Sequence, residues 1–115
     1  MLLIASVILV FCGLIHSYLG ERYILVRLFK CDNLPHLYGS DEFTKGTLRF
    51  AWHITSLAWF GFAAILSFEQ VHSELLLYTI SAVFFASGIL SAYYTKGKHF
   101  SWLLFGAISL LTFLA

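Results

Sequence analysis

Four long runs of apolar residues, separated by shorter polar segments, dominate the pattern along this chain. A helix of about 20 residues crosses the roughly 30 Å hydrocarbon core of a bilayer. None of the runs alternates with the period of two that marks a half-buried strand. Each run is therefore predicted to be a transmembrane helix, because a helix satisfies its backbone polar groups within itself. The expected spans are about 2–19, 48–68, 75–94 and 100–115.

The composition supports membrane insertion. Of the 115 residues, 60% are hydrophobic, 18% are aromatic and only 11% are charged, whereas about 25% of the residues of a soluble domain are charged. The predicted fold class is all-α: a polytopic integral membrane protein whose four transmembrane helices form one compact domain, residues 1–115. The net charge of +1 gives no reason to expect a nucleic acid partner. Cys12 and Cys31 are expected at different depths, where they do not pair.

All seven lysine and arginine residues lie in or beside two of the polar segments. Loops rich in these residues stay on the cytoplasmic side of a membrane. The first connection, about 21–46, and the third connection are therefore predicted to be cytoplasmic, with both termini and the second connection outside. The expected location is the bacterial inner (plasma) membrane.

The first connection contains helix signals of its own. The segment Tyr23–Lys30 mixes apolar residues with cations, so it either continues the first helix beyond Gly20 or lies along the membrane interface. Ser40, Asp41 and Glu42 together offer an N-cap followed by acids. The second helix is therefore expected to begin near Asp41, well before the membrane.

Two histidines are placed one helical turn inside the polar boundary of the first two spans. His16 lies roughly 7 Å of helix rise inside Glu21, and His53 lies one turn inside Arg49. Ionisable groups at this depth face the bundle interior or a wet cavity, because exposure to lipid costs a few kcal/mol. With His99 at the start of the fourth run, they are predicted to line one pocket on the cytoplasmic side.

The first hypothesis for this pocket is a transition-metal site. Neutral imidazole binds zinc, copper or iron, and three ligands with an open position are typical of catalytic or transport sites. The expected ligands are His16, His53, His99 and Glu21, with His36 as an alternative to Glu21. The function would be metal binding or a metal-dependent membrane activity. Glu21 points away from the face of His16 unless the first helix breaks at Gly20.

Other interpretations of the same residues stay open. The histidines can be interface residues held by backbone, hydroxyl or water hydrogen bonds. His16 and His53 can instead ligate haem b, a less favoured cofactor, in which case Arg22 and Arg49 would bind its anionic propionates. A proton relay through His16, Glu21 and His53 would belong to a small proton-coupled transporter.

Small residues recur at packing intervals on the second and third spans. In lipid, such columns allow close contact between helix backbones. They predict packing within one bundle, and they also permit a homo-oligomer, or a non-catalytic subunit or assembly protein bound to a partner membrane protein. The columns include Ala58, Gly61, Ala64, Ala82, Ala86, Gly88 and Ala92.

The second connection is short and acidic. Glu69, His72 and Glu74 lie close together in it. They are expected to form a solvated hairpin loop, since such loops are usually polar. Chelation of a cation is the alternative.

Overall fold

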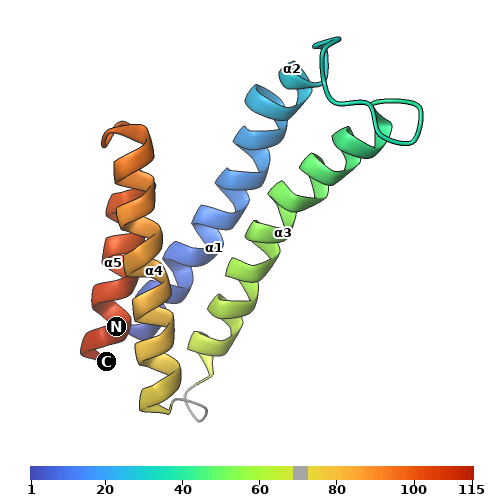
Figure 1. Cartoon of the computed structure of the whole chain (residues 1–115). Coiled ribbons are helices and arrows are strands. Elements are labelled where there is room, and N and C mark those ends of the chain that lie inside the picture. Colours follow the sequence, from blue (N-terminus) through green and yellow to red (C-terminus); the bar gives the residue numbers. More distant parts are fainter. Residues whose placement is uncertain (69–72) are drawn as a thin grey trace. The chain divides into compact units, whose positions relative to one another are not determined.

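The computed structural model describes residues 1–68 and 73–115, and throughout these ranges the regular elements are helices (Figure 1). The first helix is α1 (Leu2–Leu19), which continues into a π-helical segment, η1 (Gly20–Leu25), and a final turn, α2 (Val26–Leu28). The expectation of an all-helical fold is confirmed. The other helices are α3 (Glu42–Ser67), α4 (Glu74–Thr95) and α5 (Ser101–Leu114).

Three helices in the described part of the chain are long and apolar enough to cross a membrane. They are the continuous helix Leu2–Leu28, α3 and α4. The fourth helix, α5, is also apolar but has only 14 residues, which gives it a length of about 21 Å. The three long helices are consistent with a membrane protein, as three of the four apolar runs predicted, whereas α5 is shorter than the expected fourth span.

The structure resolves two open points about the first connection. The first helix continues past Gly20 as far as Leu28. The second helix begins at Glu42, whose backbone N–H donates to Ser40 Oγ at 3.4 Å, so its expected start near Asp41 is confirmed. Acidic residues in a first turn are favoured by the helix dipole.

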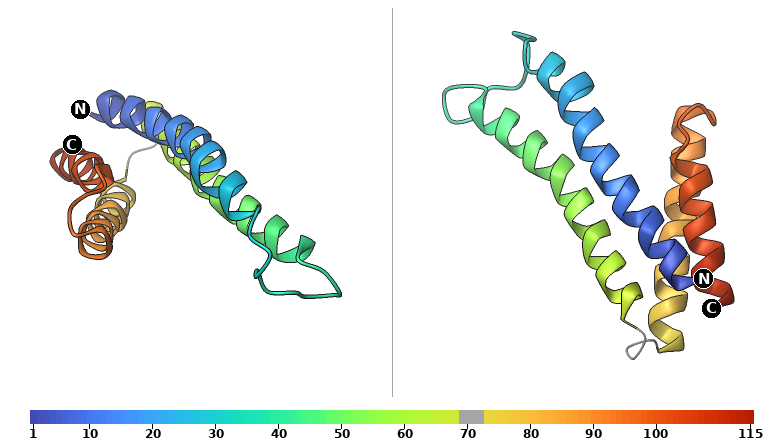
Figure 2. Two further views of the ribbon diagram at one scale, coloured as in Figure 1. Left: turned by 90° about the horizontal axis from the view of Figure 1, so that it is seen from above. Right: turned by 180° about the vertical axis from the view of Figure 1, so that it is seen from behind.

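The described residues form two compact units, residues 1–10 with 60–115 and residues 11–59. The first unit contains α4 and α5, which run side by side (Figure 2). Phe84 is only 1% exposed, and its ring lies 5.9 Å from that of Phe62 and 5.6 Å from that of Phe105. This unit is therefore centred on packed aromatic rings.

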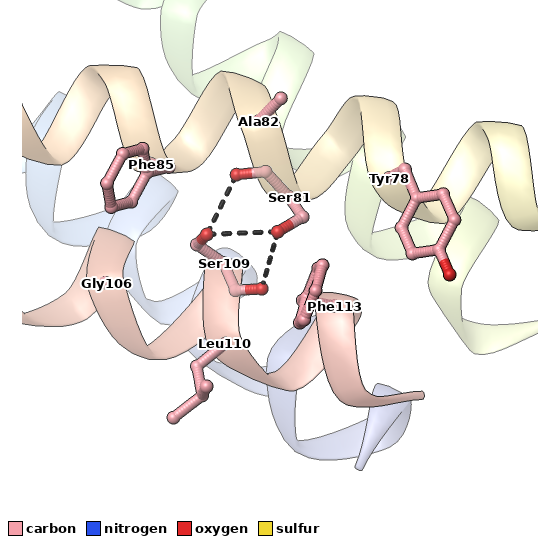
Figure 3. A pocket seen from close by; sticks show the side chains of 8 residues that line it. All are labelled: Tyr78, Ser81, Ala82, Phe85, Gly106, Ser109, Leu110 and Phe113. Atoms are coloured by element: carbon pink, nitrogen blue, oxygen red, sulfur yellow. Dashed lines mark hydrogen bonds between the residues drawn. The ribbon is translucent and has the colours of Figure 1, made fainter.

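Two serines join α4 to α5 by a reciprocal pair of hydrogen bonds (Figure 3). Ser81 Oγ donates to the carbonyl of Ser109 at 2.8 Å, and Ser109 Oγ donates to the carbonyl of Ser81 at 2.9 Å. Both serines are buried. Small side chains let the helices approach closely at this level. An open apolar groove beside the serines is lined by Tyr78, Ala82, Phe85, Gly106, Leu110 and Phe113.

A further pair of hydroxyls connects the start of α1 with the end of α3. Ser6 Oγ donates to the carbonyl of Ala63 at 2.8 Å and lies 2.7 Å from Ser67 Oγ. Ser6 is 5% exposed. Each hydroxyl thus has a partner inside the unit, as buried polar groups require.

Replacing Ser81 or Ser109 with alanine is expected to destabilise the pairing of α4 and α5 by about 0.6 kcal/mol each, the typical value for a hydrogen bond between membrane helices. Unfolding in mixed micelles, followed by circular dichroism, measures the change. Ser87→Ala is the matched control, because that hydroxyl donates to the carbonyl of Val83 on its own helix. An equal loss in the control would contradict the prediction.

Candidate functional site

The second unit, residues 11–59, consists of the later part of the first helix, the connection and the beginning of α3. The two helices run antiparallel, side by side (Figures 1 and 2). Residue 16 therefore meets residue 52, residue 17 meets residues 53 and 56, and residue 21 meets residues 49 and 53. All of the side chains that form the candidate site come from these two segments.

His16 and Trp52 exchange hydrogen bonds. The indole Nε1–H of Trp52 donates to the backbone carbonyl of His16 at 2.9 Å. His16 Nε2 lies 3.2 Å from the carbonyl of Trp52; since a carbonyl only accepts, this nitrogen carries the proton. The two rings are stacked, with centroids 4.7 Å apart and planes 4° apart. His16 is thus held flat against Trp52, and Trp59 packs against its ring at 60°.

Gly20 is the point of closest approach between the two helices. A Cβ atom at this position would lie 1.9 Å from Trp52 Nε1 and 2.3 Å from its Cε2. Only a residue without a side chain therefore fits beneath the indole. The π-helical segment begins at the same residue, and such wide turns often occur at functional sites.

Glu21 lies between two basic side chains of α3. Its Oε1 atom is 2.7 Å from Arg49 Nη2, and its Oε2 atom is 3.0 Å from His53 Nε2. Both contacts are charge-assisted, because the acceptor is an ionised carboxylate. The carboxylate is therefore neutralised from two directions. Its side chain is 34% exposed, so water reaches it.

The other nitrogen of His53 faces Ser17. His53 Nδ1 lies 2.9 Å from Ser17 Oγ, and Ser17 Oγ donates to Ser56 Oγ at 2.7 Å. Because the only hydroxyl hydrogen of Ser17 is used on Ser56, Ser17 accepts from Nδ1. Nε2 donates to the Glu21 carboxylate at the same time. Both ring nitrogens of His53 therefore have a hydrogen-bond partner.

Together these residues form one continuous line of hydrogen bonds, here called the polar chain. Its inner end, Ser56, is 2% exposed, whereas the side chain of Arg49 at the outer end is 47% exposed. Each member donates or accepts a hydrogen bond, and a carboxylate and an imidazole stand next to each other. The members of the polar chain are Ser56, Ser17, His53, Glu21 and Arg49.

The structure gives the predicted histidines separate environments. His16 stacks on Trp52, while His53 is a member of the polar chain. His99 belongs to the other unit, where its Nδ1 accepts from the backbone N–H of Ser101 at 3.2 Å and so helps to begin α5. His36 is exposed in the first connection.

Of the four predicted metal ligands, Glu21 and His53 are in direct contact. Among residues 1–68 and 73–115, no group of three or more histidine, cysteine, aspartate or glutamate side chains is placed to hold a metal ion. The metal and haem hypotheses stay predictions. The expected loop residues Glu69 and His72 lie outside the described residues.

Sequence reasoning did not identify Ser17 or Trp52 as part of the site. Ser17 lies four residues before Glu21, so a regular helical wheel already places the two on one face. That spacing was the available signal. The position of Trp52 over Gly20 depends on how the two helices meet, which no spacing along one helix specifies.

No family model, curated protein or solved structure matches this chain. Over residues 1–68 and 73–115 the regular elements are all helices, and three of these helices are long and apolar enough to cross a membrane. The function must therefore be argued from the polar chain itself.

Gly20→Ala is expected to destabilise the second unit by about 1–3 kcal/mol, the usual cost of overpacking. The added methyl group collides with an indole that is already fixed by a hydrogen bond and by stacking. Thermal unfolding in detergent measures the change. Gly46→Ala on α3 is the control, since nothing lies within 4 Å of its Cβ position; that variant should be neutral or gain about 0.5–1 kcal/mol. A Gly20→Ala variant as stable as the control would contradict the close approach.

Proposed function

We propose that this chain is an integral membrane protein whose four helices cross the bilayer as one bundle. The lengths of Leu2–Leu28, α3 and α4 support the first three crossings. With about 21 Å of helix, α5 crosses only where the bilayer thins or its ends lie in the interface. The distribution of lysine and arginine supports cytoplasmic first and third connections, with both termini outside.

The chain contains a natural reporter for this topology. Cys31 is exposed in the first connection, while Cys12 is buried in α1. A maleimide that cannot cross membranes is expected to label Cys31 in inverted inner-membrane vesicles and not in intact cells. An Ala115→Cys variant in a Cys31→Ser background should show the opposite pattern. Labelling of Cys31 from outside intact cells would contradict the orientation.

We infer further that the polar chain is a proton-binding relay, as a small proton-coupled transporter needs. One observation supports this most directly: His53 bridges the carboxylate of Glu21 and the hydroxyl of Ser17 through its two nitrogens. Ionisable residues within membrane helices commonly mark proton pathways. Histidine is the side chain that changes charge in the physiological pH range.

Proton movement through this relay would reverse the hydrogen bonds of one hydroxyl. When His53 holds protons on both nitrogens, Ser17 accepts from Nδ1 and donates to Ser56. When the Nδ1 proton leaves, the bare nitrogen becomes an acceptor, so the Ser17 hydroxyl turns from Ser56 toward His53. Glu21 stabilises the charged form of the imidazole, and Arg49 holds the carboxylate in place.

Proton flux into vesicles tests the relay. Protein reconstituted into liposomes that contain a pH-sensitive dye is expected to admit protons under a potassium-driven potential. Glu21→Gln and His53→Gln should each slow this flux by about tenfold or more. A tenfold change corresponds to a rise of about 1.4 kcal/mol in the activation free energy of proton transfer. Glu21→Gln keeps the shape of the side chain and removes only its charge.

His36→Gln is the matched control, since His36 is exposed in the connection and outside the polar chain. It should conduct at the rate of the unaltered protein. Wild-type vesicles no more permeable than empty ones would contradict the relay. If the Glu21→Gln variant conducts protons at the wild-type rate, Glu21 and its contact with His53 are not part of the relay.

Metal binding is the second candidate, favoured by the contact between Glu21 and His53, because carboxylate and imidazole are both zinc ligands. An ion there would replace the hydrogen bond between them. One ion per chain in protein purified without affinity-tag histidines, lost in His53→Gln, would favour it over the relay. Stoichiometric copurification of another membrane protein, with no ion, would favour a non-catalytic subunit.

A further inference from the structure

Two arginines on the first helix share one aromatic ring. The guanidinium carbon of Arg22 lies 5.5 Å from the centre of the Tyr23 ring, and that of Arg27 lies 5.8 Å from it. Both distances are within the range of a cation–π contact, about 6 Å. Both guanidinium groups are therefore held beside one aromatic ring, and they place two positive charges on this part of the helix surface.

The two arginines lie in different segments of the first helix, Arg22 in η1 and Arg27 in α2. In a regular α-helix, positions i and i+5 differ in direction by about 140°. In η1 the backbone bonds connect residues five apart, as between the N–H of Val26 and the carbonyl of Glu21. This wide turn reduces the difference in direction between positions 22 and 27.

In the described ranges 1–68 and 73–115, neither arginine forms an ion pair with an acidic side chain. The ion pairs in these ranges join Asp41 to Lys45, and Glu21 to Arg49 and His53. Arg22 instead donates to the hydroxyl of Tyr18 at 2.9 Å, which fixes its guanidinium from the side. Both arginines are exposed. Their N–H groups that face outward are free to bind a ligand with several oxygen acceptors.

We propose that Arg22, Arg27 and Tyr23 bind the phosphate of an anionic phospholipid. Arginine binds phosphate through paired N–H groups, and basic clusters beside a membrane helix recognise acidic headgroups. The pair follows directly on the apolar run that ends at Leu19, where the headgroups of the proposed membrane begin. Tyr18 and Tyr23, 59% and 48% exposed, suit the same interface. The site rests on the proposed membrane insertion and is independent of the proton relay.

Lipid retention tests the site. The full chain is placed in nanodiscs of equal phosphatidylglycerol and phosphatidylcholine, and the lipids that remain bound after extraction are counted by native mass spectrometry. One phosphatidylglycerol per chain is expected, and the Arg22→Gln, Arg27→Gln double variant should lose about tenfold or more of this preference. The matched control is the double variant Lys96→Gln, Lys98→Gln. It removes the same amount of charge from the third connection and should keep the preference for phosphatidylglycerol.

Several results would overturn the site. An equal loss of bound phosphatidylglycerol in the lysine control would mean that the lipid is held by general charge attraction and not by this site. Displacement of phosphatidylglycerol by excess inorganic phosphate would make the ligand a soluble phosphate. Circular dichroism of both double variants shows that the helices remain. A chain that fails to enter the nanodisc contradicts membrane insertion, whereas one that enters without lipid preference contradicts this site alone.

Discussion

The second unit depends on the contact in which the indole of Trp52 covers the backbone at Gly20. The indole fits because Gly20 has no side chain, and it is fixed there by its bond to the His16 carbonyl and by stacking on the His16 ring. This contact sets the register between the first helix and α3. Ser17 then meets His53, and Glu21 meets Arg49, in the only order that an antiparallel pair in this register allows.

The same contact coincides with the change from α to π geometry. The first helix widens at Gly20 rather than breaking there, so Glu21 remains on a helix that also presents Ser17 to α3. Further along, Arg22 and Arg27 both contact the ring of Tyr23. The acidic group at the start of the wide turn thus contacts α3, whereas the two arginines contact a side chain of their own helix.

The sequence was sufficient for features that depend on local pattern. The apolar runs predicted the helices, the acids after Ser40 predicted where α3 begins, and the spacing of His53 one turn from Arg49 agrees with their shared contact with Glu21. It was insufficient where two helices meet. The wheel assumed that the first helix is either regular or broken at Gly20, and the structure has a third geometry there. The stacking of His16 on Trp52 arises from tertiary contact, which neither residue's spacing specifies.

Hydroxyl groups form hydrogen bonds between neighbouring helices in both units. Ser6 binds the carbonyl of Ala63, Ser17 binds Ser56, and Ser81 and Ser109 bind each other. These bonds satisfy polar groups without any charge. The ion pairs of Glu21, by contrast, involve side chains that are 34–47% exposed, and exposed ion pairs contribute only about 0–1 kcal/mol. Stability therefore gives little reason to place a carboxylate, an imidazole and a guanidinium at one level of this helix pair. The proposed proton relay gives a reason for the carboxylate and the imidazole, because both groups change charge when they bind a proton.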